Sequence, residues 1–331
     1  MTKKVLITGG AGFIGSHLCD FLLQKNYHVN VIDNFSGGNK ENIAHLQYNK
    51  KFSIWNEDIR DLKKGHAAFN NVRYVFHLAG IGDIVPSIEK PVDYISVNVI
   101  GTANVLECAR YAEVEKLVYA ASSSCYGIAN TPTSENHDIN PLYPYALSKY
   151  QGEQLTFHWH KVYDLPVNSI CIFNAFGTRV KTSGAYGAVF GVFLKQKLSK
   201  KPLTIVGDGS QSRDFVYVTD VAEGFYKAAT TCYVGQRYNL GAGKPKKIKY
   251  LAELIGGKII HLPDRPGEPK CTYADIRKIQ SQIGWEPKIT FEDGVKRMLF
   301  DIDYWKDAPL WDVDKIDKAT KVWFRYMKKK D

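Results

Sequence analysis

Short apolar runs alternate along the first half of the chain with longer segments in which apolar positions recur every three or four residues. The short runs predict buried strands, and the longer pattern predicts amphipathic helices. The predicted strands are 5–7, 28–32, 52–55, 72–77, 116–120 and 167–173, and the predicted helices are 13–23, 92–111 and 143–163. Alternation of this kind predicts an α/β fold with a doubly wound parallel sheet that has helices on both faces.

The segment Thr8–Gly15, which reads TGGAGFIG, connects the first predicted strand to the first predicted helix. Glycines in such a turn let the backbone approach a pyrophosphate, and the helix N-terminus then faces the phosphates with free N–H groups. The second strand ends in Asp33, where a Rossmann-type unit places the carboxylate that holds the adenosine ribose. Because this carboxylate would repel a 2′-phosphate, we expect NAD rather than NADP.

The pattern becomes less regular from about Phe176, with more Gly, Pro and Lys and with shorter elements. Stretches 214–218, 221–229 and 237–240 look like a brief return to the sheet. We therefore expect residues 1–175, together with 213–241, to form the NAD-binding Rossmann-type domain. Residues 176–212 and 242–331 are expected to form a smaller, mixed α/β domain that binds the substrate.

Composition excludes several classes of protein. The net charge of +10 comes from scattered lysines, which indicates a solvated surface rather than a nucleic-acid interface. The six cysteines stand singly, without the spacing of a zinc site, and we expect no metal. The N-terminus does not resemble a signal peptide, and no apolar stretch is long enough to span a bilayer, so we expect a cytoplasmic protein without membrane association.

Candidate catalytic groups follow the later strands. Ser122, Ser123 and Ser124 come directly after the fifth strand, and Tyr145 and Lys149 share one face of the long helix. A tyrosine with an ordinary pKa of about 10 needs a nearby positive charge to act as a base near neutrality. Lowering that pKa by about 3 units corresponds to roughly 4 kcal/mol, and Lys149 together with an oxidised nicotinamide ring is the expected source.

Taken together, these motifs resemble the extended short-chain dehydrogenase/reductase family, and within it the nucleotide-sugar epimerase/dehydratase group. The resemblance runs nearly from end to end, through residues 8–15, 58–60, 77–79, 122–127, 145–149, 174–179, 207–218 and 265–268. It implies that Asp58 and Ile59 flank the adenine and that Ala79 lines the nicotinamide pocket. Ser122 would then bind the reacting sugar hydroxyl, Tyr145 would act as the base, and Lys149 would assist it while holding the nicotinamide ribose.

The resemblance also implies that Asn174, Arg213 and Arg265 hold the diphosphate of a nucleotide sugar. The complete prediction for the cofactor site is Gly9, Gly12, Phe13, Ile14, Gly15, Asp33, Asn34, Asp58, Ile59, Leu78, Ala79, Tyr145 and Lys149. For the substrate site it is Ser87, Ser122, Ser123, Asn174, Val189, Arg213 and Arg265, and for catalysis Ser122, Tyr145 and Lys149.

The positions after Ser122 bear on the reaction. Dehydratases of this family place an Asp-Glu pair there to move protons, and UDP-glucuronate decarboxylases usually keep a glutamate at the second position. Here both positions are serine, and a hydroxyl cannot easily replace a carboxylic acid. The sequence therefore favours an NAD-dependent 4-epimerase, most simply of a UDP-hexose, with 4,6-dehydration and decarboxylation as alternatives. A non-catalytic NAD-binding sensor on the same fold would have no use for the Ser-Tyr-Lys set.

Three further features carry expectations. Residues 181–190 differ from the uridine-binding loop of the best-known UDP-glucose 4-epimerases, which leaves the base and the sugar open. The long helix offers Leu155, Phe157 and Trp159 away from its catalytic face, and such helices often pair in this family, so we expect a homodimer. The aromatic stretch 304–311 and the amphipathic segment 316–326 are expected to pack on their own domain.

Overall fold

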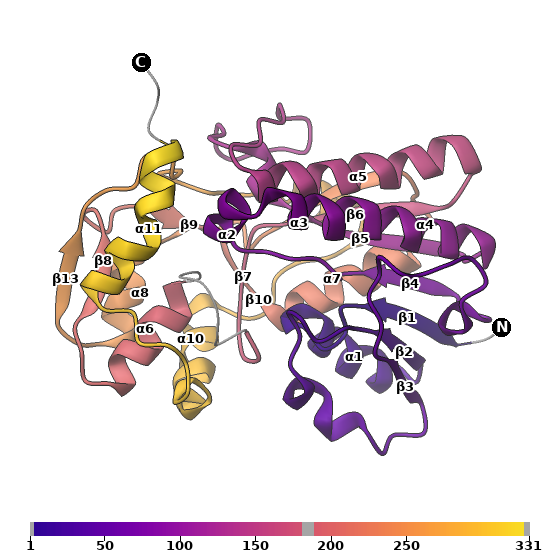
Figure 1. The fold of residues 1–331 in the computed structure, drawn as a ribbon, viewed down its shortest axis with the longest axis horizontal. Coiled ribbons are helices and arrows are strands. Elements are labelled where there is room, and N and C mark those ends of the chain that lie inside the picture. Colours follow the sequence, from indigo (N-terminus) through magenta and orange to yellow (C-terminus); the bar gives the residue numbers. More distant parts are fainter. Residues whose placement is uncertain (1–2, 181–188, 328–331) are drawn as a thin grey trace.

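The computed structural model describes residues 3–180 and 189–327, and its largest element is a seven-stranded sheet in the order β11-β6-β5-β4-β1-β2-β3 (Figure 1). Every neighbouring pair of these strands is parallel. The strands are β1 (Lys4–Thr8), β2 (His28–Ile32), β3 (Phe52–Trp55), β4 (Tyr74–His77), β5 (Lys116–Ser122), β6 (Val167–Ile172) and β11 (Gln236–Leu240). The Rossmann-type α/β class predicted from the alternation is thereby confirmed.

Helices cover both faces of this sheet because alternate side chains of each strand point in opposite directions. In β1, Val5 and Ile7 join the core under α1 (Phe13–Gln24) and α7 (Val218–Thr230). Leu6 joins the core on the other face, under α4 (Thr102–Tyr111) and α5 (Pro144–Tyr163). Figure 1 shows these two pairs of helices on opposite sides of the strands.

The helix predicted over 92–111 is not one regular α-helix. It consists of α3 (Pro91–Ile95), a π-helical turn η3 (Ser96–Gly101) and α4. Within this turn, Asn98 Nδ2 donates to Ser148 Oγ at 2.9 Å, and Asn98 Oδ1 accepts from Ile81 N at 2.8 Å. The π-turn therefore links α5 to the loop that follows β4, where π-turns in other proteins often mark functional sites.

A separate hydrophobic core lies beside the main sheet, at the left of Figure 1. The aromatic rings of Phe176, Phe190, Phe215 and Phe291 pack against one another at its centre. The elements here are β7 (Asn174–Phe176), β8 (Leu203–Val206), β9 (Ser212–Arg213), β10 (Phe215–Tyr217), β12 (Lys246–Lys247), β13 (Ile259–Leu262), α6 (Val189–Leu198), α8 (Ile248–Ile255) and α10 (Phe291–Phe300). These elements follow Phe176, where the smaller domain was predicted to begin.

One segment near the C-terminus packs on the main sheet rather than on the smaller core to which the prediction assigned it. Ile279 in α9 (Arg277–Ile283) and the nearby Trp285 are fully buried in the core of the main sheet, although 242–331 was assigned to the smaller domain. Trp285 Nε1 donates to the carbonyl of Asp220 in α7 at 2.9 Å, and this hydrogen bond helps to hold the segment against the main sheet. The rest of the proposed domain division stays a prediction.

The remaining elements are short apart from the last helix. They are η1 (Lys40–Leu46), η2 (Ala67–Phe69), α2 (Ile84–Glu89), η4 (Ser123–Tyr126), η5 (Ile302–Trp305) and α11 (Val313–Met327). In α11, Ile316, Thr320 and Trp323 form a buried face, as expected of a packed amphipathic helix. Within residues 3–180 and 189–327, no helix has both the length and the apolar character needed to cross a bilayer.

Candidate active site

A cavity of about 650 Å³ opens at the carboxyl ends of β1, β2 and β4, where the strand order reverses. In an open parallel sheet this switch point is where ligands bind. The cavity is lined by eleven of the predicted cofactor residues, namely Gly9, Gly12, Phe13, Ile14, Gly15, Asp33, Asn34, Asp58, Ile59, Leu78 and Ala79. The structure therefore brings together residues that lie up to seventy positions apart in the sequence.

The glycine turn admits no side chains at its tightest positions. Gly9 has a φ of +75°, and a Cβ there would lie 2.7 Å from the backbone nitrogen of Ala79. A Cβ at Gly15 would lie 2.1 Å from the carbonyl oxygen of Gly9. The turn thus packs directly on the loop after β4 and directs the N-terminus of α1 toward the cavity, which favours an anionic group there.

Asp33 is held rigidly at the end of β2. Its Oδ2 accepts from Ala11 N at 2.9 Å and its Oδ1 accepts from Phe35 N at 2.8 Å. Burial raises the pKa of this carboxyl group, and the two backbone hydrogen bonds oppose that rise. The carboxylate is therefore oriented by the backbone on one side and lines the cavity on the other.

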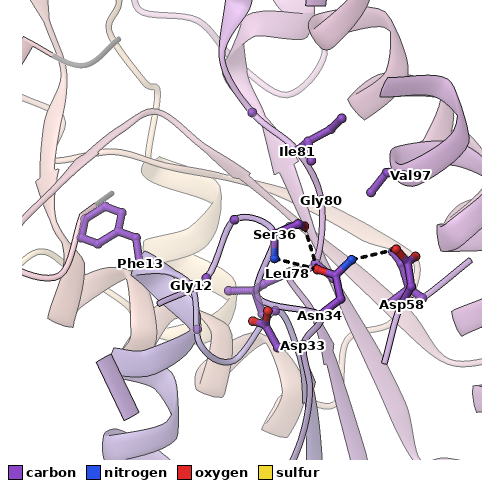
Figure 2. A pocket seen from close by; sticks show the side chains of 18 of the residues that line it. Gly12, Phe13, Asp33, Asn34, Ser36, Asp58, Leu78, Gly80, Ile81 and Val97 are labelled. Atoms are coloured by element: carbon purple, nitrogen blue, oxygen red, sulfur yellow. Dashed lines mark hydrogen bonds between the residues drawn. The ribbon is translucent and has the colours of Figure 1, made fainter. Parts of the chain in front are cut away.

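Polar side chains extend from Asp33 along one wall of this cavity (Figure 2). Asn34 Nδ2 donates to Asp58 Oδ2 at 2.7 Å, and Asn34 Oδ1 accepts from both the backbone and the hydroxyl of Ser36. Hydrogen bonds from Arg60 hold the pKa of Asp58 down at about 2. Apolar Ile81 and Val97 also line the cavity, which therefore offers carboxylates and an amide for hydroxyl groups as well as an apolar surface for a flat ring.

This set of groups fits a dinucleotide. The helix N-terminus suits a pyrophosphate, the buried carboxylate suits the hydroxyls of a ribose without a 2′-phosphate, and the apolar wall suits an adenine. Among the described residues, no three His, Cys, Asp or Glu side chains are grouped so as to hold a metal ion.

A second cavity, of about 420 Å³, lies between the main sheet and the smaller core. Its lining includes the predicted residues Ser122, Ser123, Tyr145, Asn174, Val189, Arg213 and Arg265. Ser87 is not among them, because it is fully buried within α2, where its hydroxyl donates to the carbonyl of Ile84 at 2.6 Å. Of the segment 181–190, whose sequence differs from the expected uridine loop, residues 181–188 lie outside the described part of the chain.

The hydroxyl groups predicted to be catalytic meet at the end of β5. Ser122 Oγ lies 2.7 Å from Ser124 Oγ, and Ser122 also hydrogen-bonds with Tyr145. Tyr143, which precedes α5, hydrogen-bonds with Ser124, and its ring stacks on Tyr145 with 6.5 Å between the centroids. Two tyrosines therefore face two serines in one cavity.

The pKa of Tyr145 is raised in the protein alone. Burial raises it, the hydrogen bond with Ser122 opposes this rise, and the nearby carboxylate of Asp83 adds to it. The physical reason for the rise is that a phenolate loses more hydration in this cavity than the surrounding side chains replace. The predicted lowering depends on Lys149 together with a bound, oxidised nicotinamide ring, so it stays a prediction for the NAD complex.

Lys149 lies one helical turn beyond Tyr145, as its spacing requires. The ammonium nitrogen lies 4.4 Å from the centroid of the Tyr119 ring, and burial lowers the pKa of Lys149 to about 8. Glu153, one further turn along α5, opposes that shift. Glu153 is fully buried and is held by Arg237 and by Ser169 Oγ, so the charged groups on this face of α5 occupy defined positions.

The two predicted phosphate arginines share a carboxylate. Arg213 donates to Glu268 Oε1 at 2.6 Å and to the carbonyl of Pro269 at 2.8 Å. An Arg265 nitrogen lies 3.9 Å from Glu268 Oε2. The Arg213 side chain is only 12% exposed, so this pair is more than a solvated surface contact. Thr272 Oγ1 donates to Asn174 Oδ1 at 2.8 Å and orients the predicted amide beside them.

Sequence reasoning missed several lining residues. Asp83 lines both cavities, at the point where they adjoin, and Tyr143 and Trp323 line the second. Asp83 has a φ of +72°, a strained conformation for a residue with a side chain, which is common at functional sites. Tyr143 could have been noticed beside Tyr145, whereas no local pattern marks Asp83 or Trp323, which reach the site through tertiary packing.

Comparison with known proteins identifies the class to which this site belongs. Residues 6–298 match the family model described as GDP-mannose 4,6 dehydratase. The chain is 38% identical to a putative UDP-glucose 4-epimerase of Methanocaldococcus jannaschii over 304 residues, which are 89% of this chain and 97% of the relative. The chain therefore belongs to the NAD-dependent nucleotide-sugar epimerase/dehydratase family, as its motifs predicted.

Solved structures of nucleotide-sugar epimerases have the same fold as this chain. UDP-glucuronic acid 4-epimerase from Bacillus cereus, in complex with UDP-glucuronic acid and NAD, is 32% identical, with a TM-score of 0.83 over 92% of this chain and 99% of its own. UDP-N-acetylglucosamine 4-epimerase from Methanobrevibacter ruminantium, in complex with UDP-N-acetylmuramic acid, is 30% identical, with a TM-score of 0.84 over 91% and 99%. Decarboxylases and dehydratases also occur among the relatives, so membership establishes nucleotide-sugar chemistry rather than one reaction.

Proposed function

We propose that this protein interconverts nucleotide sugars, most simply UDP-hexoses, that differ in configuration at C4. The observation that carries the proposal is the group formed by Ser122, Ser124 and Tyr145, which offers a base and hydroxyl groups where dehydratases of the family carry an acid pair. The relatives named as 4-epimerases support the same choice.

In the proposed reaction, Ser122 holds the sugar 4-hydroxyl and Tyr145 takes its proton. NAD, when bound, supplies the acceptor for the hydride from C4 and the hydride that returns, and its positive ring favours the phenolate. The 4-keto sugar turns in the cavity so that the opposite face of C4 receives the returning hydride. Tyr145 then gives the proton back to the 4-oxygen. Arg213 and Arg265, which line the same cavity, are proposed to retain the diphosphate while the sugar turns.

Dehydration is the second candidate, because the structure brings a carboxylate that sequence reasoning did not consider. Asp83 lines the cavity that contains Tyr145, and its charge acts on the phenol. A carboxyl group at this place could move a proton when water leaves C6. The two serines after Ser122 therefore disfavour dehydration without removing every acid from the site.

Product analysis separates these reactions. The NAD-loaded protein is incubated with UDP-glucose, UDP-N-acetylglucosamine and UDP-glucuronic acid, and the products are examined by mass spectrometry and proton NMR. We expect a 4-epimer of unchanged mass from at least one sugar. A product lighter by one water would establish the dehydratase instead, and release of carbon dioxide from the uronic acid would establish a decarboxylase. A sensor without catalysis would bind NAD and leave all three sugars unaltered.

We also propose a homodimer formed through α3, η3, α4 and α5, which pack together; Figure 1 shows α3, α4 and α5 on one face of the sheet. Leu155, Phe157 and Trp159 pack partly against their own core, while Val92 and Ile100 stay 75% and 55% exposed. Apolar side chains this exposed on adjacent helices favour a partner surface.

Sedimentation at micromolar concentration tests this assembly. We expect a dimer for the wild type and a monomer for Ile100→Arg, because a guanidinium group at an apolar interface would lose its hydration. Phe300→Arg is the matched control, since Phe300 is 90% exposed on α10, away from this surface. A wild-type monomer, or equal dissociation in both variants, would refute the proposed interface.

A further inference from the structure

The helix α11 lies outside residues 6–298 that match the family model, yet it reaches the substrate cavity. It passes beside α2 of the main-sheet side (Figure 1) and packs against it. Its buried face consists of Ile316, Thr320 and Trp323, at spacings of four and three, which is one stripe of a helix. Two of these residues, Thr320 and Trp323, line the cavity that contains Ser122 and Tyr145.

Trp323 connects two parts of the site. Its Nε1 donates to the carbonyl of Pro266 at 2.7 Å, one residue after the predicted phosphate ligand Arg265. Its ring centroid lies 6.1 Å from that of Tyr143, which in turn stacks on Tyr145 with an interplanar angle of 8°. The indole therefore bridges the phosphate loop and the stacked tyrosines, and it is only 6% exposed.

Trp323 completes one wall of the cavity that contains Ser122 and Tyr145. Ile84 and Val85 of α2, Tyr143 and Thr320 line the same cavity as the catalytic hydroxyl groups. The Thr320 hydroxyl donates to the carbonyl of Ile316 at 2.8 Å within its own helix, so it is already engaged as a donor. This wall is therefore bulky and largely apolar, and it limits the sugar by its shape rather than by hydrogen bonds.

We propose that α11 determines which sugars the enzyme accepts, with Trp323 as the main specificity-determining residue. This inference rests on the proposed nucleotide-sugar chemistry and deepens it. The indole restricts the space beside the ring substituents of the sugar and holds Tyr143 against Tyr145. Removing it enlarges the sugar end of the cavity, whereas the diphosphate is still held by Arg213.

The test compares kcat/KM for UDP-N-acetylglucosamine with kcat/KM for UDP-glucose. For Trp323→Ala, we expect the ratio to rise by about tenfold or more, the discrimination that one small group in an apolar pocket provides. Thr320→Ala, which keeps the indole in place, is expected to raise the ratio by a smaller factor. Trp323→Phe keeps an aromatic ring and loses the hydrogen bond to Pro266. We expect it to lower kcat/KM for both sugars by the same factor.

Two reference variants make the result specific. Tyr326→Ala removes an aromatic side chain that is 61% exposed on the same helix. We expect it to leave kcat/KM unchanged for both UDP-N-acetylglucosamine and UDP-glucose. Arg213→Ala should raise KM for both sugars by the same factor, because both carry the diphosphate. If Trp323→Ala behaves like Arg213→Ala, or if the ratio does not rise, then α11 is structural and the inference is overturned.

Binding measurements keep this inference separate from the proposed reaction. Calorimetric titration of NAD-loaded wild type and Trp323→Ala with UDP, UDP-glucose and UDP-N-acetylglucosamine requires no turnover. We expect the affinity for the N-acetylated sugar relative to UDP-glucose to rise in the variant, while the affinity for UDP changes less. If the wild type converts no sugar, the proposed function fails, and these affinity ratios still decide the role of Trp323.

Discussion

Tyr145→Phe is expected to lower kcat by about 1,000-fold while leaving the affinity for NAD largely unchanged. The phenolic oxygen is the proposed proton acceptor, and a positioned general base contributes roughly 10²- to 10⁴-fold to a rate. The substitution keeps the ring that stacks on Tyr143, and the glycine turn and Asp33 are untouched. Steady-state kinetics with the best UDP-sugar and a fluorescence titration with NAD measure the two effects.

Tyr143→Phe is the matched control for this experiment. Tyr143 lines the same cavity and hydrogen-bonds with Ser124, but its hydroxyl group is not assigned to the reaction. We expect a loss of less than about tenfold, the order of one hydrogen bond worth roughly 1 kcal/mol. Equal losses in the two variants would show that the cavity needs both phenols, and a Tyr145→Phe enzyme with more than a tenth of wild-type activity would contradict the assignment of the base.

The second large effect concerns the choice of cofactor. NAD is expected to bind at least about 100-fold more tightly than NADP, a difference of roughly 2.7 kcal/mol. The reason is that the backbone of Ala11 and Phe35 holds the Asp33 carboxylate in the cavity wall, where a 2′-phosphate would meet a buried negative charge. Asp33→Asn keeps the shape and removes the charge, so the preference should fall below about tenfold by calorimetric titration.

Asp61→Asn serves as the control for Asp33→Asn. Asp61 is an exposed carboxylate that does not line the cofactor cavity, so its removal tests whether total charge alone alters nucleotide affinity. We expect the wild-type preference to persist in this variant. Equal affinity of the wild type for NAD and NADP would remove Asp33 from the ribose site, whatever the variants show.

Local patterns predicted several residues of the first cavity. The turn between β1 and α1 and the carboxylate that ends β2 can be read from short stretches because glycine conformation and strand ends are governed by near neighbours. Tyr145 and Lys149 are one helical turn apart for the same reason, since the periodicity of a helix places them on one face. All eleven residues predicted for the cofactor apart from this pair line the first cavity.

Other parts of the site depend on contacts between distant segments. Ser87 could not be placed from its neighbours, because the packing of α2 decides that it is buried rather than exposed to the cavity. In the protein alone the pKa of Tyr145 is raised by burial and by Asp83 and is opposed by Ser122, and these groups come from distant segments of the chain, so the spacing to Lys149 does not determine it. The return of Trp285 to the main core likewise follows from a hydrogen bond with α7.

The sequence by itself thus predicted the alternation of strands and helices, the glycine turn and the shared helix face of Tyr145 and Lys149, because each arises from backbone conformation or spacing within a few residues. Tertiary packing decides the shape of the substrate cavity, where Asp83, Tyr143 and Trp323 meet from segments far apart in sequence. That shape depends on how hydrophobic surfaces from distant segments pack together, and local sequence patterns do not predict such packing. The nucleotide-sugar family can therefore be recognised from the sequence, whereas the proposed selection of the sugar depends on the tertiary structure.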